Sequence, residues 1–87
     1  MKHTLTLQKD MVAGDGARLG GDVIAYYFGG MPTGEEAKIR NDGAPERNDW
    51  RVLRIKGEKS SGWTGNFEGA QLALEWLQGE IDREQGT

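Results

Sequence analysis

The residues that could carry acid–base or nucleophilic chemistry are few and scattered. The chain of 87 residues has one histidine, His3, and no cysteine. Cys-His pairs are therefore excluded, and a triad would need His3 beside a remote serine or threonine. No HExxH motif, CxxC motif or histidine cluster occurs, so neither a transition-metal site nor a cofactor is expected. Fourteen carboxylates offer many pairs for glycosidase-type chemistry, but no spacing selects one. A protein that is not an enzyme is the prediction, and a carboxylate enzyme is its least supported alternative.

A glycine-rich stretch at residues 14–21 is a candidate for a phosphate cradle. A Walker loop would continue with Gly-Lys-Ser/Thr into a helix, whereas a strand-like run follows from Asp22. A dinucleotide fingerprint would need glycine at the position of Leu19. Asp15 and Asp22 would repel phosphate and lack the spacing of a calcium loop. Residues 11–21 are therefore predicted to form a turn or a flexible hairpin tip.

The tail from Trp63 to Asp82 is the only long segment with helical periodicity, and it carries the best candidate binding surface. Its main apolar stripe, which is expected to face the core, consists of Ala70, Ala73, Leu74, Leu77 and Ile81. Leu72 and Trp76 lie one turn apart on one side, about 100° or more from the centre of that stripe. Leu72 is expected to be exposed. Trp76 either joins it as a partner-binding anchor or covers the sheet edge, and both alternatives stay open.

Charge is unevenly distributed along the chain. Residues 38–59 carry seven basic and four acidic side chains, net +3, whereas residues 60–87 have a net charge of −4. Either these segments lie side by side in one domain, or the acidic helix is offered to a basic partner. The predicted protein-binding site comprises Leu72, Trp76, Glu75, Glu80 and Arg83.

An aromatic and basic sheet surface is the alternative site. Its residues could stack nucleic-acid bases and contact phosphates, and they are Tyr26, Tyr27, Trp50, Arg51 and Arg54. The number of basic residues is low for tracking a phosphate backbone, so a nucleic-acid-binding regulator is the second hypothesis.

Short, glycine-punctuated strands are expected before the helix. Alternation or β-propensity marks them at residues 2–9, 22–28, 36–40, 50–56 and 63–67, with 22–28 as a central strand and 36–40 as a weaker one. A bulge near Val52-Leu53 would bring Trp50 and Ile55 to one side. Residues 57–62 are expected to be a turn. The fold class is α+β: one domain, 1–87, with a mainly antiparallel four- to five-stranded meander and the C-terminal helix packed on one face.

The ends of that helix have their own signals. Asn66 or Glu68 is expected to cap its start or to favour its positive end. Gly79 costs about 1 kcal/mol relative to alanine, so fraying is expected after it. Residues 84–87 are expected to be a loose tail.

Membrane and export signals are missing. No apolar run approaches the roughly 20 residues that a membrane helix needs, and the first residues lack a signal peptide. We expect a cytoplasmic protein that is complete from Met1 and does not enter a membrane. The lack of cysteine fits a reducing compartment.

The second half of the chain resembles small phage and bacterial α/β proteins, including several anti-CRISPR inhibitors. The resemblance covers Trp50 to Lys56, the glycine turn up to Gly62-Trp63, and the Phe67-Glu68-Gly69-Ala70 step into Leu74-Glu75-Trp76-Leu77. It implies a non-catalytic inhibitor that binds a large bacterial protein, such as a defence complex, through charge and a few aromatics. A homodimer is the alternative partnership. The resemblance transfers no specific site residues.

Overall fold

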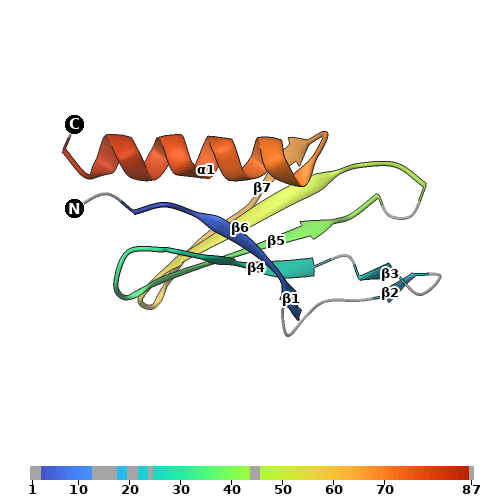
Figure 1. Cartoon of the computed structure of the whole chain (residues 1–87), viewed down its shortest axis with the longest axis horizontal. Helices are drawn as coiled ribbons and strands as arrows, with labels where there is room; N and C mark the ends of the chain where they lie inside the picture. The colour runs from blue at the N-terminus through green and yellow to red at the C-terminus, as the bar shows by residue number, and fades with distance from the viewer. Residues whose placement is uncertain (1–2, 13–17, 20–21, 24, 44–45, 87) are drawn as a thin grey trace.

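The computed structural model describes residues 3–12, 18–19, 22–23, 25–43 and 46–86. A five-stranded antiparallel sheet has the strand order β1-β4-β5-β6-β7, and helix α1 lies across one of its faces (Figure 1). The bounds are β1 Thr6–Val12, β4 Ala25–Gly29, β5 Glu35–Asn41, β6 Trp50–Lys56, β7 Lys59–Phe67 and α1 Ala70–Glu84. Two short strands, β2 Arg18–Leu19 and β3 Asp22–Val23, pair with each other beyond one end of the sheet. The predicted α+β meander with a C-terminal helix is confirmed.

The hydrophobic core lies between α1 and the sheet. Its buried members are Leu5, Phe28, Ala37, Ile39 and Val52 from the sheet side and Ala73, Leu77 and Ile81 from the helix. Ala70 and Leu74 pack against this cluster and are partly buried. The stripe that helical periodicity predicted is therefore the face that α1 turns to the sheet.

Strand β5, expected to be a weak strand, is the centre of the sheet. It pairs with β6 without interruption from Glu35↔Lys56 to Asn41↔Trp50, and with β4 along its other edge. Ala37 and Ile39 are buried beneath α1, while Glu36, Lys38 and Arg40, which alternate with them, point to the other face. The central position compensates for a modest local propensity, because both ladders and the core hold the strand.

The run at residues 22–28 belongs to two strands. Asp22 and Val23 pair with β2, whereas β4 pairs with β1 and β5 and is thus an interior strand. Ile24 lies outside the described residues. So does most of the predicted turn at residues 11–21, apart from the end of β1 and the whole of β2, which are strand rather than turn.

Strand β6 does not have the expected bulge at Val52-Leu53, so that prediction is wrong. It alternates regularly against β5, and the register shifts occur where β6 meets β7. Regular alternation puts Arg54 on the same face as Val52, toward the helix, where Arg54 is only 9% exposed. This placement is stable because Glu35 and Glu84 both contact its guanidinium. The predicted turn at 57–62 is also shorter, since β7 starts at Lys59.

Both ends of α1 differ from expectation. The N-cap is Gly69, and no side chain caps the helix, so the capping roles predicted for Asn66 and Glu68 are wrong. The helix continues past Gly79 to Glu84. Ile81 is fully buried and Glu84 pairs with Arg54, and these tertiary contacts outweigh the intrinsic cost of glycine. Glu84 is thus helical rather than part of a loose tail, while Thr87 lies outside the described residues.

Candidate protein-binding site

One helix cannot cover the whole sheet face on which it lies. A helix with its side chains is about 10–12 Å wide, whereas five strands spaced about 4.8 Å apart span roughly 19 Å. A margin therefore has to remain on at least one side of α1. The structure closes the margin toward β1 and leaves the margin toward β7 hollow.

Gln78 closes the β1 margin. Its Nε2 donates a hydrogen bond to the carbonyl oxygen of His3 at 2.7 Å, and its Oε1 accepts one from the N–H of Leu5 at 2.8 Å. The same Nε2 donates to Oδ1 of Asp82 at 3.1 Å. This one amide side chain ties the start of the chain to α1. His3 lies just before β1 and in no strand, and its backbone carbonyl contacts the helix.

A groove of about 300 Å³ occupies the β7 margin. It is lined by Val52, Arg54, Lys56, Ser61 and Thr64 from the strands and by Trp76, Glu80 and Glu84 from the helix. Its floor is the sheet, one wall is α1, and the opposite side is the free edge of β7. We call this hollow the α1–β7 groove.

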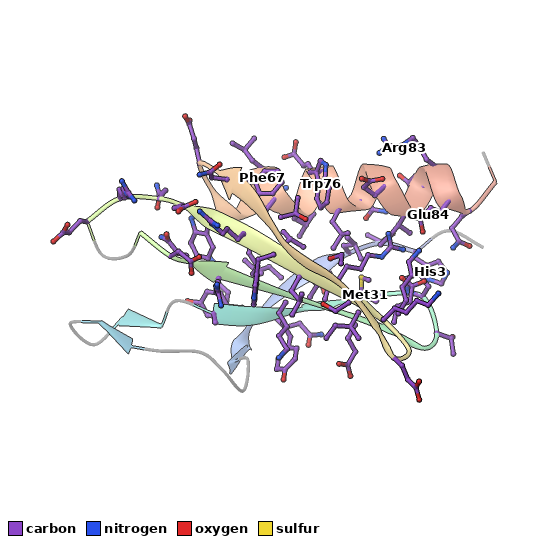
Figure 2. All side chains as sticks on the ribbon, turned by 180° about the vertical axis from the view of Figure 1, so that it is seen from behind. His3, Met31, Phe67, Trp76, Arg83 and Glu84 are labelled. Carbon is purple, nitrogen blue, oxygen red and sulfur yellow. The ribbon has the colours of Figure 1, made fainter. Side chains whose placement is uncertain are left out.

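Trp76 lines the groove, and its position bears on whether it packs on the sheet or is exposed for a partner, which the sequence leaves open. Its ring centroid lies 5.5 Å from that of Phe67, at an interplanar angle of 44°, and Figure 2 shows the two side chains next to each other. Trp76 packs on the core yet remains partly exposed as a groove wall. It is therefore both a core residue and an available surface.

Leu72 is exposed, as expected. It is the one large hydrophobic side chain, among those the structure describes, that is counted as exposed, with 53% of its surface accessible. It lies one turn before Trp76 on the same side of α1. Together they form an apolar strip, the Leu72–Trp76 ridge, that continues into the α1–β7 groove.

The other predicted helix residues divide between two sides. Glu80 lines the groove, and its Oε2 accepts a hydrogen bond from Nη2 of Arg83 at 2.8 Å. Arg83 points away from the sheet (Figure 2). Glu75 lies farther round the helix, where Nε2 of Gln71 donates to it. The structure thus brings Trp76 and Glu80 together at the groove and pairs Glu80 with Arg83, while Leu72 adjoins Trp76 and Glu75 lies apart.

An ion network centred on the buried Arg54 supports the far end of the groove. Arg54 donates through Nε and Nη2 to Oε1 of Glu35 at 2.9 and 2.7 Å, and through Nη1 and Nη2 to the two carboxylate oxygens of Glu84 at 2.8 and 2.7 Å. Nζ of Lys56 lies 3.2 Å from the same Glu84. Sheet and helix of opposite net charge therefore do lie side by side.

The network shifts the pKa values of its members. Hydrogen bonds from Arg54 are the largest cause that lowers the pKa of Glu84 from 4.5 to about 2, and burial opposes them. For Arg54, burial alone would lower the pKa, but hydrogen bonds to Glu84 and Glu35 outweigh it and leave the pKa above its ordinary value. Both groups are thus held in their charged forms.

The predicted aromatic and basic site is divided between two faces. Tyr26, Trp50 and Arg54 face the helix, whereas Tyr27 and Arg51 face the other side. That other side, over which no described element lies, is the uncovered sheet face. It carries the half-buried side chains Tyr27, Lys38, Arg40, Arg51, Leu53, Ile55 and Trp63. Five residues predicted as one surface therefore do not form one.

Cations on the uncovered sheet face lie over its aromatic rings. Nζ of Lys38 is 5.9 Å from the ring centroid of Tyr27, and the guanidinium carbon of Arg40 is 4.0 Å from that of Trp63. Asp42 lies 2.7 Å from Nε of Arg40 and 3.4 Å from Nε of Arg51. These contacts leave less positive charge available than the sequence suggests.

The sequence patterns did not predict that Lys38, Arg40 and Trp63 lie on the uncovered sheet face, or that Thr64 lines the groove. Period-two alternation along β5 would have placed Lys38 and Arg40 together. The position of Trp63 depends on its pairing with Leu53 across a shifted register, which no local pattern reveals.

Metal and membrane features are absent from the described part of the chain. No group of three or more His, Cys, Asp or Glu residues is placed there to hold a metal ion. No described helix combines the length and apolar character needed to cross a bilayer. Comparison of the chain with protein-family models, curated proteins and solved structures gives no match.

Proposed function

We propose that this chain is a non-enzymatic protein-binding module and that its contact surface is the Leu72–Trp76 ridge with the adjoining α1–β7 groove. The observation that carries the proposal is Leu72, which is 53% exposed beside a tryptophan that the core already holds in place. A partly exposed aromatic ring fixed by its neighbours loses little side-chain entropy on binding, which is typical of interface anchors.

The energetics fit a surface that needs a partner. Covering the exposed part of Leu72 contributes about 1 kcal/mol from apolar area. Covering the free side of Trp76 adds a similar amount, since part of that ring is already buried. The acidic tail of residues 60–87, with a net charge of −4, favours a partner whose contact surface is basic.

The resemblance to anti-CRISPR inhibitors extends this proposal to a bacterial target. In that form, the protein inhibits a large bacterial protein by occupying one of its surfaces. A second copy of the chain is the alternative occupant. Native mass, measured on the protein alone and with its target, separates the two.

Capture from a bacterial lysate tests the proposal. Wild-type protein is compared with Leu72→Asp and with Thr33→Asp, a matched control in an exposed turn outside the ridge and the groove. We expect wild type and Thr33→Asp to retain the same proteins and Leu72→Asp to lose them, with unchanged far-UV circular dichroism in all three. Equal capture by all three proteins would show that the ridge is not the interface.

A second candidate function is nucleic-acid binding at the uncovered sheet face. Lys38 over Tyr27 and Arg40 over Trp63 are the specific observation in its favour. The test is a mobility-shift titration with a single-stranded oligonucleotide at about 50 mM salt, where phosphate contacts are strong. No shift at micromolar protein would remove this candidate.

A further inference from the structure

The outer edge of β7 lies next to the α1–β7 groove. β7 pairs with β6 on one side and ends the strand order, and no described segment pairs with its other edge. The backbone of an edge strand presents unpaired N–H and C=O groups that can pair with another strand.

Access to this edge is open. Residues 59–62 of β7 are all exposed, Ser60 and Ser61 have small side chains, and Gly62 has none. The N–H of Gly62 donates to Oγ of Ser60 at 3.3 Å and its carbonyl accepts from Oγ of Ser61 at 2.9 Å, so an added strand would replace these two local hydrogen bonds. Thr64 lies on the helix-facing side and lines the groove, opposite Trp76 and Glu80 on α1. A strand added to β7 would direct every second side chain toward the helix and into this hollow.

We propose that the partner binds as an extended segment that pairs with the free edge of β7 and inserts alternate side chains into the α1–β7 groove. A free strand edge beside a helix-walled groove suits this mode, in which main-chain hydrogen bonds supply affinity and the groove supplies specificity. The inference rests on the proposed function, since it names how the partner of that same site is held.

The groove walls define the chemistry of the segment. Trp76 and Thr64 favour an apolar side chain. Glu84 is already bound by Arg54 and Lys56, whereas the described ion pair of Glu80 is with Arg83, whose side chain is 69% exposed. A lysine or arginine of the partner can therefore approach Glu80, so the inward-facing residues of the segment are apolar and basic.

Charge also distinguishes this occupant from a second copy of the chain. Pairing two β7 edges would bring two acidic tails, each with a net charge of −4, close together. Like charges at that distance oppose association. A basic segment of another protein instead meets the carboxylate of Glu80 on the helix wall with the opposite sign.

Selection from a displayed library of random peptides, about 12 residues long, against the full chain tests the inference. Recovered peptides are synthesised and titrated, and amide hydrogen exchange is measured with and without peptide. We expect alternating apolar and basic residues, and slower exchange for β7 amides within 59–67. A selection that yields no peptide tighter than roughly 100 μM contradicts strand addition, as does a bound peptide that leaves β7 exchange unchanged.

Paired variants locate the bound peptide. Thr64→Tyr fills the groove, and Ser60→Tyr, its control, places the same ring on the opposite side of the same strand. Glu80→Lys reverses the wall charge, and Glu58→Lys does so in the exposed turn. We expect both groove variants to weaken binding about tenfold or more and both controls to change it less than about twofold. Unfolding curves confirm that each variant is folded.

Leu72→Asp separates the inference from the proposed function. Leu72→Asp could weaken peptide binding while Thr64→Tyr leaves it unchanged and the peptide does not slow the exchange of β7 amides. In that case the ridge binds a partner but strand addition is wrong. If Leu72→Asp, Thr64→Tyr and Glu80→Lys all bind like wild type, the inference and the proposed site are both wrong. A concentration-dependent dimer that masks β7 amides would identify a second copy as the occupant and overturn the basic segment.

Discussion

The space between α1 and the sheet is filled toward β1 and is left partly open toward β7. Toward β1, Gln78 bridges the helix and the segment just before the strand with two hydrogen bonds to the backbone of His3 and Leu5. Toward β7, Trp76 and Glu80 stand over a hollow of about 300 Å³. An amide satisfies polar backbone groups and seals its side, whereas an indole and a carboxylate leave space between helix and strand. The β7 margin, which keeps a hollow beside the ion pair of Arg54 and Glu84, is therefore the one available to a partner.

Breaking the β7 margin at Arg54 should have the largest effect on stability. Arg54→Ala removes the cation between Glu35 and Glu84 and leaves two carboxylates close together. We expect a loss of about 2–3 kcal/mol in the free energy of unfolding, less than for a fully buried pair because Glu84 is 39% exposed. Urea denaturation measures it. Lys56→Ala, whose side chain is 52% exposed, is the control and should cost less than about 1 kcal/mol.

Opening the β1 margin should cost somewhat less. Gln78→Ala leaves the N–H of Leu5 and the carbonyl of His3 without their helix partner, so we expect a loss of about 1–2 kcal/mol. Gln71→Ala removes an exposed amide of the same type from α1 and should change stability by less than about 0.5 kcal/mol. Equal effects of the two substitutions in urea denaturation would show that the bridge does not stabilise this margin.

Acid should weaken the β7 margin through Glu84. Its pKa is lowered from 4.5 to about 2 in the folded protein. Because the folded value is the lower one, the contribution is complete above pH of about 4.5 and is lost as the pH falls toward about 2. At neutral pH, Glu84→Gln should cost about 1 kcal/mol or less, given its exposure. Stability curves of wild type and variant should converge across this window, and a constant gap would contradict the assignment.

A substitution outside both margins should have the smallest effect and the opposite sign. A Cβ at Gly79 would meet Nη1 of Arg83 at an ordinary 3.6 Å. Gly79→Ala should therefore stabilise the helix by roughly 0.5–1 kcal/mol, seen as a higher melting temperature. Gly62→Ala is the contrast, since Gly62 has φ +74° and its replacement should destabilise by about 1 kcal/mol.

Local pattern predicted most of the fold. Spacing alone predicts the stripe of Ala73, Leu77 and Ile81, because the residues that share one helix face are determined by the local sequence. Arg54 was not found, because its environment depends on Glu35 and Glu84, which lie 19 and 30 residues away. The same long-range pair extends α1 beyond Gly79. Periodicity treats a charged residue as solvated, and only tertiary contacts show where one is buried.

The candidate site was predictable in part for the same reason. Angles around the helix identified Leu72 as exposed and put Trp76 beside it. They could not show that Phe67 holds the Trp76 ring or that Thr64 lies across a groove, because both contacts depend on how β7 enters the helix. The alternative sheet site is wrong because it assigns adjacent residues of one strand to the same surface. Tyr26 and Tyr27 are adjacent, and adjacent residues of a strand point to opposite faces.

The bridge made by Gln78 also orders events during folding. Its contacts with Leu5 and His3 span 73 and 75 residues, whereas β4 to β7 pair with their immediate neighbours in the chain. Closing a long loop costs more entropy than forming successive hairpins, so the hairpins can form first. On the ribosome the chain emerges from its N-terminus, so the contacts of His3 and Leu5 with Gln78 can form only after α1 has been synthesised.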